Sequence, residues 1–157
     1  MNRHDGDFAG QPSWPPPPSF GAGGAAPQQV PLQSSEDVVR LRKLVRDAAV
    51  AQGMSLVDQT KLVTAASELA RNTVVYGGGG HAEILPVSAG GRRGVQLRFV
   101  DRGPGIPDVQ AALRDGFTTG NGMGLGLGGA RRLSDAFDIV TAPQRGTTVT
   151  ITRYGAF

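Results

Sequence analysis

Apolar side chains recur every three or four positions in two runs of the chain, which is the spacing of one face of an α-helix. The first run starts behind Ser34 and Ser35, residue types that cap helix N-termini, and stops at Gly53. Its apolar positions are Val38, Leu41, Leu44, Val45, Ala48 and Ala49. The second run starts near Val57, stops at the glycine run 77–80, and presents on one face Leu62, Ala65, Ala66, Leu69 and Thr73. The pattern predicts two amphipathic helices.

Beyond the glycine run the pattern changes to stretches that are typical of strands. Residues 82–88 and 94–101 predict two strands joined by a turn rich in glycine and arginine, hence an antiparallel hairpin. Pro86 has no backbone N–H, so we expect the first of these strands to lie at a sheet edge or to be interrupted. Residues 137–142 and 147–154 predict a second strand pair around the turn 143–146.

Two further helical segments are predicted between the strand pairs. Residues 107–113 indicate a short helix, and residues 127–137 indicate another helix after a glycine-rich loop. The predicted order is helix, helix, hairpin, helix, loop, helix, hairpin. This order favours an α+β fold, a two-layer sandwich with the helices on one face of a mixed, mainly antiparallel sheet.

The first 35 residues differ from the rest in composition. They hold most of the prolines and few aliphatic residues, so they cannot bury enough surface to offset the entropy lost on ordering. We therefore predict a disordered tail, residues 1–35, and one folded domain, residues 36–157. The tail segment 14–20, Trp-Pro-Pro-Pro-Pro-Ser-Phe, favours polyproline II and could dock in an aromatic groove of a partner, but a solvated tail is the simpler expectation.

Length and composition narrow the function classes. A chain of 157 residues supports one compact domain and hence one main site. It has no cysteine, which excludes disulfides and thiolate metal centres, and no signal-peptide pattern, so we expect a cytoplasmic protein. No stretch is long and apolar enough to span a membrane. The net charge of +3 comes from scattered arginines without a basic run, which argues against nucleic acid as a partner.

Two polar residues of the second predicted helix are suited to act together. Glu68 and Asn72 are four residues apart, so they share a helix face with Cβ atoms about 5–6 Å apart. A carboxylate can take a proton from an attacking nucleophile, and an amide oxygen is a neutral ligand for magnesium that phosphates also hold. Taken alone, the pair is more typical of the polar stripe of an amphipathic helix.

A predicted strand ends abruptly at Asp101, which is followed by Gly103 and Gly105. A carboxylate at a strand end is well placed to accept a hydrogen bond from the amine of a base. The two glycines let the backbone turn sharply and approach a ligand without Cβ clashes. A simple tight turn would use the same residue types.

A second glycine cluster precedes the helix predicted from residue 127. It directs backbone N–H groups towards an anion, and its members are Gly122, Gly124, Gly126, Gly128 and Gly129. The cluster is neither a Walker loop nor a Rossmann turn. Met123, Leu125 and Leu127 are interleaved with the glycines, which argues against a flexible linker.

The order of these motifs is more specific than any one of them. Residues 68–72 lie on a helix, residues 101–108 follow a strand, residues 122–133 precede a helix, and residues 146–151 form the last strand. This order resembles the ATP-binding fold shared by gyrase, Hsp90, histidine kinases and MutL, over residues 36–154. Within that superfamily the chain resembles the small bacterial serine kinases that regulate sigma factors, and especially the RsbT-type switch kinases.

The resemblance implies that ATP and Mg²⁺ bind in one pocket and that a serine or threonine of a STAS-domain protein is phosphorylated. By motif position it implies that Glu68 is the general base, that Asn72 is the magnesium ligand and that Asp101 binds the adenine amine. The other implied nucleotide contacts are Gly103, Gly105, Gly122, Gly124, Gly126 and Thr148, with Thr147 as the alternative to Thr148. No motif assigns a role to the nearby arginines, which are candidates to neutralise phosphate charge: Arg71, Arg131 and Arg132.

A second function class is open beside the kinase. The nucleotide-loaded form of such a protein can act as an anti-sigma factor or a phosphatase activator, with a sigma factor or a phosphatase regulatory domain as its partner. The intact pair of Glu68 and Asn72 favours the kinase. A homodimer is compatible with either class.

Overall fold

The computed structural model describes residues 26–114 and 126–155. In these ranges one antiparallel sheet has the strand order β1-β2-β3-β5-β4. The strands are β1 (Gln28–Leu32), β2 (Gly80–Ala89), β3 (Arg92–Asp101), β4 (Ala136–Ala142) and β5 (Gly146–Tyr154). The helices are α2 (Ser35–Ala51), α3 (Leu56–Val75), α4 (Val109–Ala112) and α5 (Gly126–Arg132).

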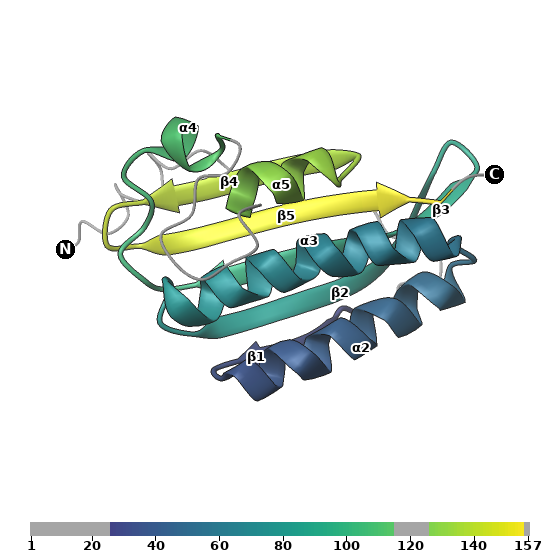
Figure 1. The fold of residues 1–157 in the computed structure, drawn as a ribbon, viewed down its shortest axis with the longest axis horizontal. Coiled ribbons are helices and arrows are strands. Elements are labelled where there is room, and N and C mark those ends of the chain that lie inside the picture. Colours follow the sequence, from purple (N-terminus) through teal and green to yellow (C-terminus); the bar gives the residue numbers. More distant parts are fainter. Residues whose placement is uncertain (1–25, 115–125, 156–157) are drawn as a thin grey trace.

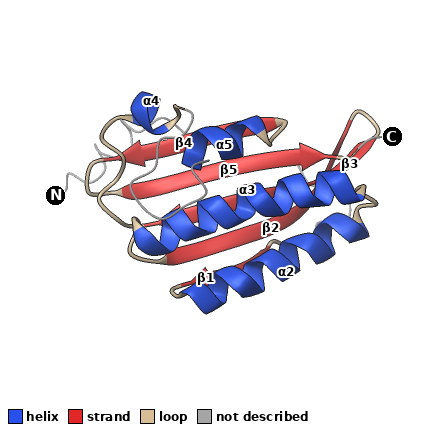
Figure 2. Ribbon diagram, viewed as in Figure 1, coloured by secondary structure: helices blue, strands red, loops and turns tan. Residues whose placement is uncertain are grey.

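The helices form one layer and the strands the other. Figure 1 shows α2, α3 and α5 side by side on the same side of the sheet, with α2 and α3 running along the strands. The same view coloured by secondary structure separates the helical layer from the strand layer (Figure 2). The predicted α+β two-layer sandwich is confirmed, and the described sheet is antiparallel throughout.

Local sequence signals set the starts of the two long helices. The Ser34 side chain caps α2 by accepting a hydrogen bond from the N–H of Asp37, and Ser55 caps α3 through the N–H of Asp58. Between them Gly53 adopts a φ of +75°, which reverses the chain after α2. Both predicted helices are present, and α3 starts at Leu56.

The core fills the space between the two layers. In β3, every second side chain points at the helices because strand residues alternate between faces. The buried residues that meet there include Leu41 and Val45 of α2, Leu62 and Leu69 of α3, Val95, Leu97 and Phe99 of β3, and Val149 and Ile151 of β5. This core holds the glutamate-bearing face of α3 over the ends of β3 and β5.

The N-terminal strand corrects one prediction. Residues 1–35 were predicted to be disordered, but residues 28–32 form β1 and Ser35 is the first residue of α2. Val30 and Leu32 are 1% and 0% exposed, because β1 pairs with β2 and turns both side chains into the core. Two apolar residues among prolines and glutamines give a weak local signal, so only pairing with β2 defines the strand. Residues 1–25 of the predicted tail lie outside the described residues.

Two other element predictions differ in detail. Pro86 lies beyond the end of β1, which pairs with β2 only up to Ile84, so the proline has a described neighbouring strand on one side only. The predicted edge position is therefore right locally, although the strand is continuous. The helix predicted to reach residue 137 ends at Arg132, and Phe137 instead pairs with Ile151 in the β4–β5 hairpin. Cross-strand pairing overrides the helical pattern there.

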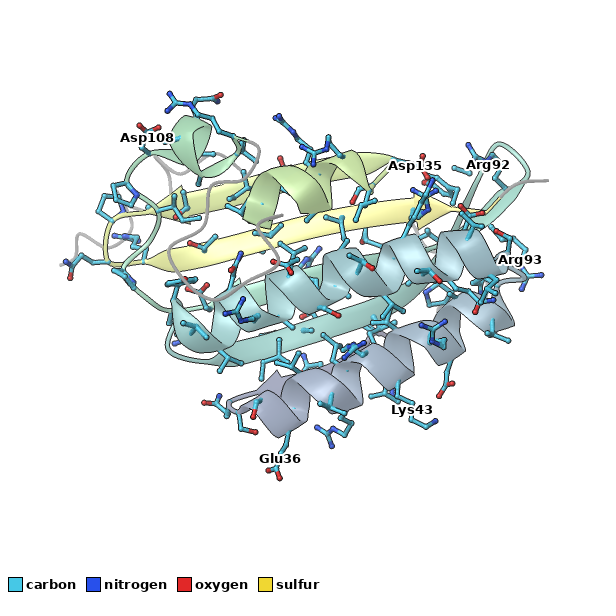
Figure 3. The ribbon with its side chains drawn as sticks, viewed as in Figure 1. Glu36, Lys43, Arg92, Arg93, Asp108 and Asp135 are labelled. Carbon is cyan, nitrogen blue, oxygen red and sulfur yellow. The ribbon has the colours of Figure 1, made fainter. Side chains whose placement is uncertain are left out.

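Two arginines at the β2–β3 turn connect this end of the sheet to neighbouring segments. Figure 3 labels Arg92 and Arg93 at the β2–β3 turn, close to the C-terminal end of α2. Arg93 donates to the carbonyl oxygen of Ala51 at 2.9 Å, and Arg92 donates to the carbonyl oxygen of Gly155 at 3.0 Å. In the described residues no helix combines the length and the apolarity that a membrane span requires.

Candidate functional site

A cavity opens between the C-terminal half of α3, the end of β3, the following turn and the first residues of α5. Its polar walls are formed by Glu68, Arg71, Asn72, Thr73, Tyr76, Asp101 and Thr147. The remaining lining is apolar or glycine: Leu69, Gly77, Phe99, Pro104, Gly105, Ile106, Ala112, Gly126, Leu127 and Val149. Most of the described residues that the sequence singled out therefore meet around one space.

The α3 wall carries the two residues whose spacing suggested a joint role. Glu68 and Asn72 both line the cavity, as expected for positions four apart on one helix face. Glu68 is 7% exposed, and among the described residues no group donates a hydrogen bond to its carboxylate. Its neighbour Leu69 is buried in the core and holds this turn of α3 in place. Glu68 is thus a nearly buried residue that lines the cavity and has no described hydrogen-bond donor.

Asp101 occupies the opposite wall, at the last residue of β3. Its Oδ1 accepts hydrogen bonds from the N–H of Gly103 at 2.9 Å and from the N–H of Thr147 at 3.2 Å. Burial raises the pKa of Asp101 above its ordinary value, and the two backbone donors oppose that rise. These bonds orient the carboxyl group and leave Oδ2 as an acceptor at the cavity.

The glycine after α3 allows this arrangement, because a side chain at residue 77 would collide with Asp101. A Cβ atom on Gly77 would lie 2.6 Å from Oδ2 of Asp101. Gly103 does not line the cavity, but a Cβ there would lie 2.8 Å from the carbonyl oxygen of Gly77. The sequence prediction placed Gly103 in the base pocket. In the structure Gly103 contributes indirectly, because its N–H donates a hydrogen bond to Asp101, which lines the cavity.

The threonine on β5 that faces the cavity is Thr147. Val149 and Ile151 point into the core, so alternation places Thr147 on their side of the sheet and Thr148 on the other. Of the two threonines that the sequence offered for the adenine site, Thr147 lines the cavity and Thr148 does not. The Thr147 hydroxyl lies 2.9 Å from the hydroxyl of Thr141, which also accepts the N–H of Ile106 at 2.9 Å.

The Thr141 hydroxyl has a further hydrogen-bond partner. The Thr141 hydroxyl is 3.2 Å from the carbonyl oxygen of Gly146 and can donate its single proton there. When Thr141 donates to Gly146, Thr147 donates to Thr141 and its lone pairs remain available to a ligand, although either hydroxyl of the pair can be the donor. The Thr141 contacts also fasten the turn 103–106 to β4. Residue spacing along the chain gave no signal for Thr141, which lies 40 residues after Asp101.

The second glycine cluster is described only in part. Gly126 starts α5 with a φ of +55° and lines the cavity. Gly122 and Gly124 lie outside the described residues. Of the three candidate arginines Arg71 lines the cavity, whereas Arg131 and Arg132 are exposed in the last turn of α5 and do not.

The donor set at the cavity can be tested against the implied metal and nucleotide. The described residues contain no group of three or more His, Cys, Asp or Glu side chains that would hold a metal ion by themselves. A magnesium ion bound mainly by phosphates and water needs only one or two protein oxygens, and the amide oxygen of the cavity-lining Asn72 fits that requirement. The cradle formed by Gly77, with Oδ2 of Asp101 open towards the cavity, fits a flat base carrying an amine.

The part of the chain that forms the cavity matches a known protein family. Residues 57–153 match the family model described as histidine kinase-, DNA gyrase B-, and HSP90-like ATPase. The chain belongs to this ATPase family. The match runs from α3 to β5 and so includes every described wall of the cavity, and membership of an ATPase family implies that the protein uses ATP.

Individual relatives of this ATPase point to its enzyme class. It is 40% identical over 120 residues to the serine/threonine-protein kinase RsbT of Bacillus subtilis, covering 76% of this chain and 90% of that protein. It is also 25% identical over 128 residues to the anti-sigma F factor of Thermoanaerobacter sp., covering 78% and 89% of the two chains. The prediction of an ATP-dependent serine/threonine kinase related to RsbT-type kinases and anti-sigma factors is confirmed at this level.

A solved structure supports the fold alone. The RsbU and RsbW domains of Rv1364c from Mycobacterium tuberculosis superpose with a TM-score of 0.58 at 21% sequence identity. The alignment covers 83% of this chain and 33% of that longer one.

The contribution of the glycine run 77–80 to the site was not predicted from the sequence, where the run marks only the end of α3. One glycine is enough to terminate a helix. A run of four glycines was the available signal that the backbone also needs to approach another element closely, and that element is the end of β3.

Proposed function

We propose that this ATPase transfers the γ-phosphoryl group of ATP to a serine or threonine of a STAS-domain protein in a bacterial partner-switching pathway. The observation that carries the proposal is the placement of two different sets of groups on opposite walls of one cavity. Glu68 and Asn72 face it from α3, and Asp101 and Thr147 face it from the ends of β3 and β5.

The Asp101 wall is suited to a purine base. Oδ2 of Asp101 is an acceptor for an exocyclic amine, and the lone pairs of Thr147 lie on the neighbouring strand, paired in register with Asp101. Adenine carries a 6-amino group beside a ring nitrogen, and an ordered water at Thr147 can donate to that nitrogen. We assign Asp101 and Thr147 to the base, with Gly77 and Gly105 shaping the space around it.

The α3 wall is suited to the phosphates. We assign the Asn72 amide oxygen to a magnesium ion, which supplies charge neutralisation at the phosphates when bound. The Arg71 guanidinium lines the same cavity and provides a second positive charge. Phosphoryl transfer depends mainly on positioning and charge neutralisation, so this wall needs few groups.

We assign to Glu68 the role of general base, which accepts the proton of the incoming hydroxyl. Glu68 is 7% exposed and lies one helical turn before Asn72, so we place its carboxylate next to the phosphate end, largely shielded from bulk water. A positioned general base contributes about 10²–10⁴-fold to a rate. Its removal should therefore lower transfer strongly while leaving the base-binding wall intact.

The test uses the full chain with labelled ATP, Mg²⁺ and a panel of STAS-domain proteins. Glu68→Gln and Glu68→Ala should bind ATP with near wild-type affinity and lose about 10²-fold or more of the transfer rate. Glu36→Gln is the matched control, because Glu36 is an exposed residue in the first turn of α2 (Figure 3) and does not line the cavity. Transfer by Glu68→Ala at the wild-type rate would remove the proposed role of Glu68.

A second candidate function rests on the relationship to an anti-sigma F factor. In this alternative the ATP-loaded chain sequesters a sigma factor or switches a phosphatase regulatory domain, and phosphoryl transfer is secondary. Co-purification of the full chain with a sigma factor, together with no label transfer to any STAS-domain protein, would favour the alternative. Label on a single serine or threonine of one STAS-domain protein favours the kinase.

A further inference from the structure

A single cationic side chain lines the cavity among the described residues. The lining includes two carboxylates, those of Glu68 and Asp101, and Arg71 is its only described Lys, Arg or His. The two lysines of the chain, Lys43 and Lys61, are exposed and do not line the cavity. The side-chain positive charge that the described walls offer to a polyphosphate therefore comes from Arg71.

The charge of Arg71 is not neutralised by a described residue. Arg71 follows Glu68 by three positions on α3, a spacing at which arginine and glutamate side chains commonly form an ion pair. In the structure these two side chains form no ion pair, and no described residue accepts a hydrogen bond from the Arg71 guanidinium. Arg42 and Arg131 also lack such a partner, but both are exposed and solvated. An unpaired guanidinium at a cavity wall has its N–H donors available to an anionic ligand.

The position of Arg71 along α3 indicates which part of a nucleotide it can reach. Gly77 and Asp101 lie at the base end of the cavity, just beyond Val75, the last residue of α3. Glu68 lies about 10 Å before Val75 along the helix axis, at a rise of about 1.5 Å per residue. Long side chains on a helix lean towards its N-terminus, so we expect Arg71 to extend towards Glu68 and away from the base end. That direction leads to the terminal phosphate of a bound ATP.

The charges at this end of the cavity require a cation. The γ-phosphoryl group is anionic, and the function proposed above places it next to the carboxylate of Glu68, which has the same sign of charge. Like charges at close range repel each other strongly in a cavity that excludes water. A guanidinium near both groups offsets this repulsion, and its planar fork can bind two phosphoryl oxygens at once.

We propose that Arg71 binds the γ-phosphoryl group, so that it distinguishes ATP from ADP and stabilises that group during transfer. The role in transfer rests on the proposed function, whereas the role in distinguishing the two nucleotides concerns binding alone. In the transfer step a bond forms between the serine or threonine Oγ and the γ-phosphorus, and the bond from that phosphorus to the β–γ bridging oxygen breaks. ADP leaves with the electron pair, and Glu68 accepts the hydroxyl proton. Arg71 exchanges no proton and acts through its charge and hydrogen bonds.

The other described arginines near the cavity fit this role less well. Arg102 follows Asp101 at the base end, and Arg114 follows the short helix α4. Arg131 and Arg132 lie in the last turn of α5. All four are exposed, and none of them lines the cavity. Arg71 is therefore the arginine to test.

The binding test compares two nucleotides on the full chain, with Mg²⁺ present. In titration calorimetry, Arg71→Gln should bind a non-hydrolysable ATP analogue about tenfold to a hundredfold more weakly than wild type, because it loses a charge-assisted hydrogen bond. Its affinity for ADP should stay at the wild-type value, which also shows that the variant is folded. Arg42→Gln is the matched control on the exposed side of α2 and should change neither affinity. An equal loss for both nucleotides, or no loss for either, would overturn the assignment.

The rate test uses labelled ATP, Mg²⁺ and the STAS-domain protein that the wild-type chain phosphorylates. At saturating ATP, Arg71→Gln should lower the transfer rate about 10³-fold or more, the contribution of arginines that stabilise a transferring phosphoryl group. Arg71→Lys should lower both the rate and the preference for ATP by smaller factors, because lysine keeps the charge but not the planar fork. This variant decides the question if Arg71→Gln does not fold. Transfer by Arg71→Gln or Arg71→Lys at the wild-type rate would remove the role in transfer.

The two tests separate the assignment of Arg71 from the proposed function. If the wild-type chain labels no STAS-domain protein while Arg71→Gln loses its preference for ATP over ADP, the kinase proposal fails and Arg71 still binds the γ-phosphoryl group. If the wild-type chain labels a STAS-domain protein while Arg71→Gln keeps its preference for ATP, the kinase proposal holds and the assignment of Arg71 is wrong.

Discussion

Replacement of Gly77 by alanine should disable the nucleotide site without touching any group that contacts the phosphates. The added Cβ would lie 2.6 Å from Oδ2 of Asp101, well inside van der Waals contact, so Asp101 has to move. Movement weakens the hydrogen bonds to Asp101 from the N–H groups of Gly103 and Thr147, at 2.9 and 3.2 Å. The loss of one hydrogen bond to a charged group costs about 1.5–3 kcal/mol.

The same displacement removes the acceptor for the base. A loss of about 1.5–3 kcal/mol in binding free energy corresponds to a drop in ATP affinity of about tenfold to a hundredfold. Calorimetric titration of Gly77→Ala with a non-hydrolysable ATP analogue measures this drop. Urea unfolding of the same samples measures the accompanying change in stability.

The next residue provides the matched control. Gly78 adopts a φ of +73° but has nothing within 4 Å of the position of an added Cβ. Gly78→Ala should therefore cost about 1–2 kcal/mol of stability from backbone strain while ATP affinity stays unchanged. If Gly77→Ala bound the analogue as tightly as Gly78→Ala, the contact between Gly77 and Asp101 would not be needed for the site.

Three further predictions address electrostatics and strand orientation. Burial raises the pKa of Asp101, so its charged carboxylate opposes folding above that pKa. The variant Asp101→Asn should therefore be at least as stable as wild type at pH 7, and the difference in stability should fade below about pH 4. The same variant should bind ATP weakly. The hydrogen bond from Arg153 lowers the pKa of Asp58, so this pair should stabilise the fold above about pH 4 and lose its effect as the pH falls through the lowered pKa. Urea unfolding of wild type and Asp58→Asn measures this loss, and a stability difference between the two proteins that does not change with pH would show that the pair is inert. Thr147→Val should reduce ATP affinity about tenfold while Thr148→Val should not, and the opposite order in titration calorimetry would reverse the assignment of the two strand faces.

The geometry of the Asp58–Arg153 ion pair indicates how much stability its loss should cost. Nη2 and Nε of Arg153 lie 2.7 and 3.2 Å from Oδ1 of Asp58, and Nη1 donates to the carbonyl oxygen of Leu133 at 2.8 Å. The arginine thereby joins the start of α3, strand β5 and the residue after α5. Because both side chains are mostly buried, loss of the pair should cost more than the 0–1 kcal/mol typical of exposed pairs.

Local sequence determined the parts of this protein that depend on neighbours along the chain. The caps at Ser34 and Ser55 and the apolar periodicity set α2 and α3, and the four-residue spacing put Glu68 and Asn72 on one face. These features follow from hydrogen bonds and side-chain contacts within one or two helical turns, so they can be predicted from the sequence alone. The order of the motifs was sufficient to indicate the ATPase family.

Tertiary structure decided what depends on pairing between distant segments. Strand β1 exists because Val30 and Leu32 gain burial against β2, although their own segment is rich in proline and glutamine. Thr147 rather than Thr148 faces the cavity because a shift of one residue in register reverses the face of a strand. The contact of Gly77 with Asp101 joins residues 24 positions apart, and no local propensity encodes it. The chemical groups of the site could therefore be predicted from the sequence, whereas their arrangement around one cavity depends on the packing of β3 and β5 against α3.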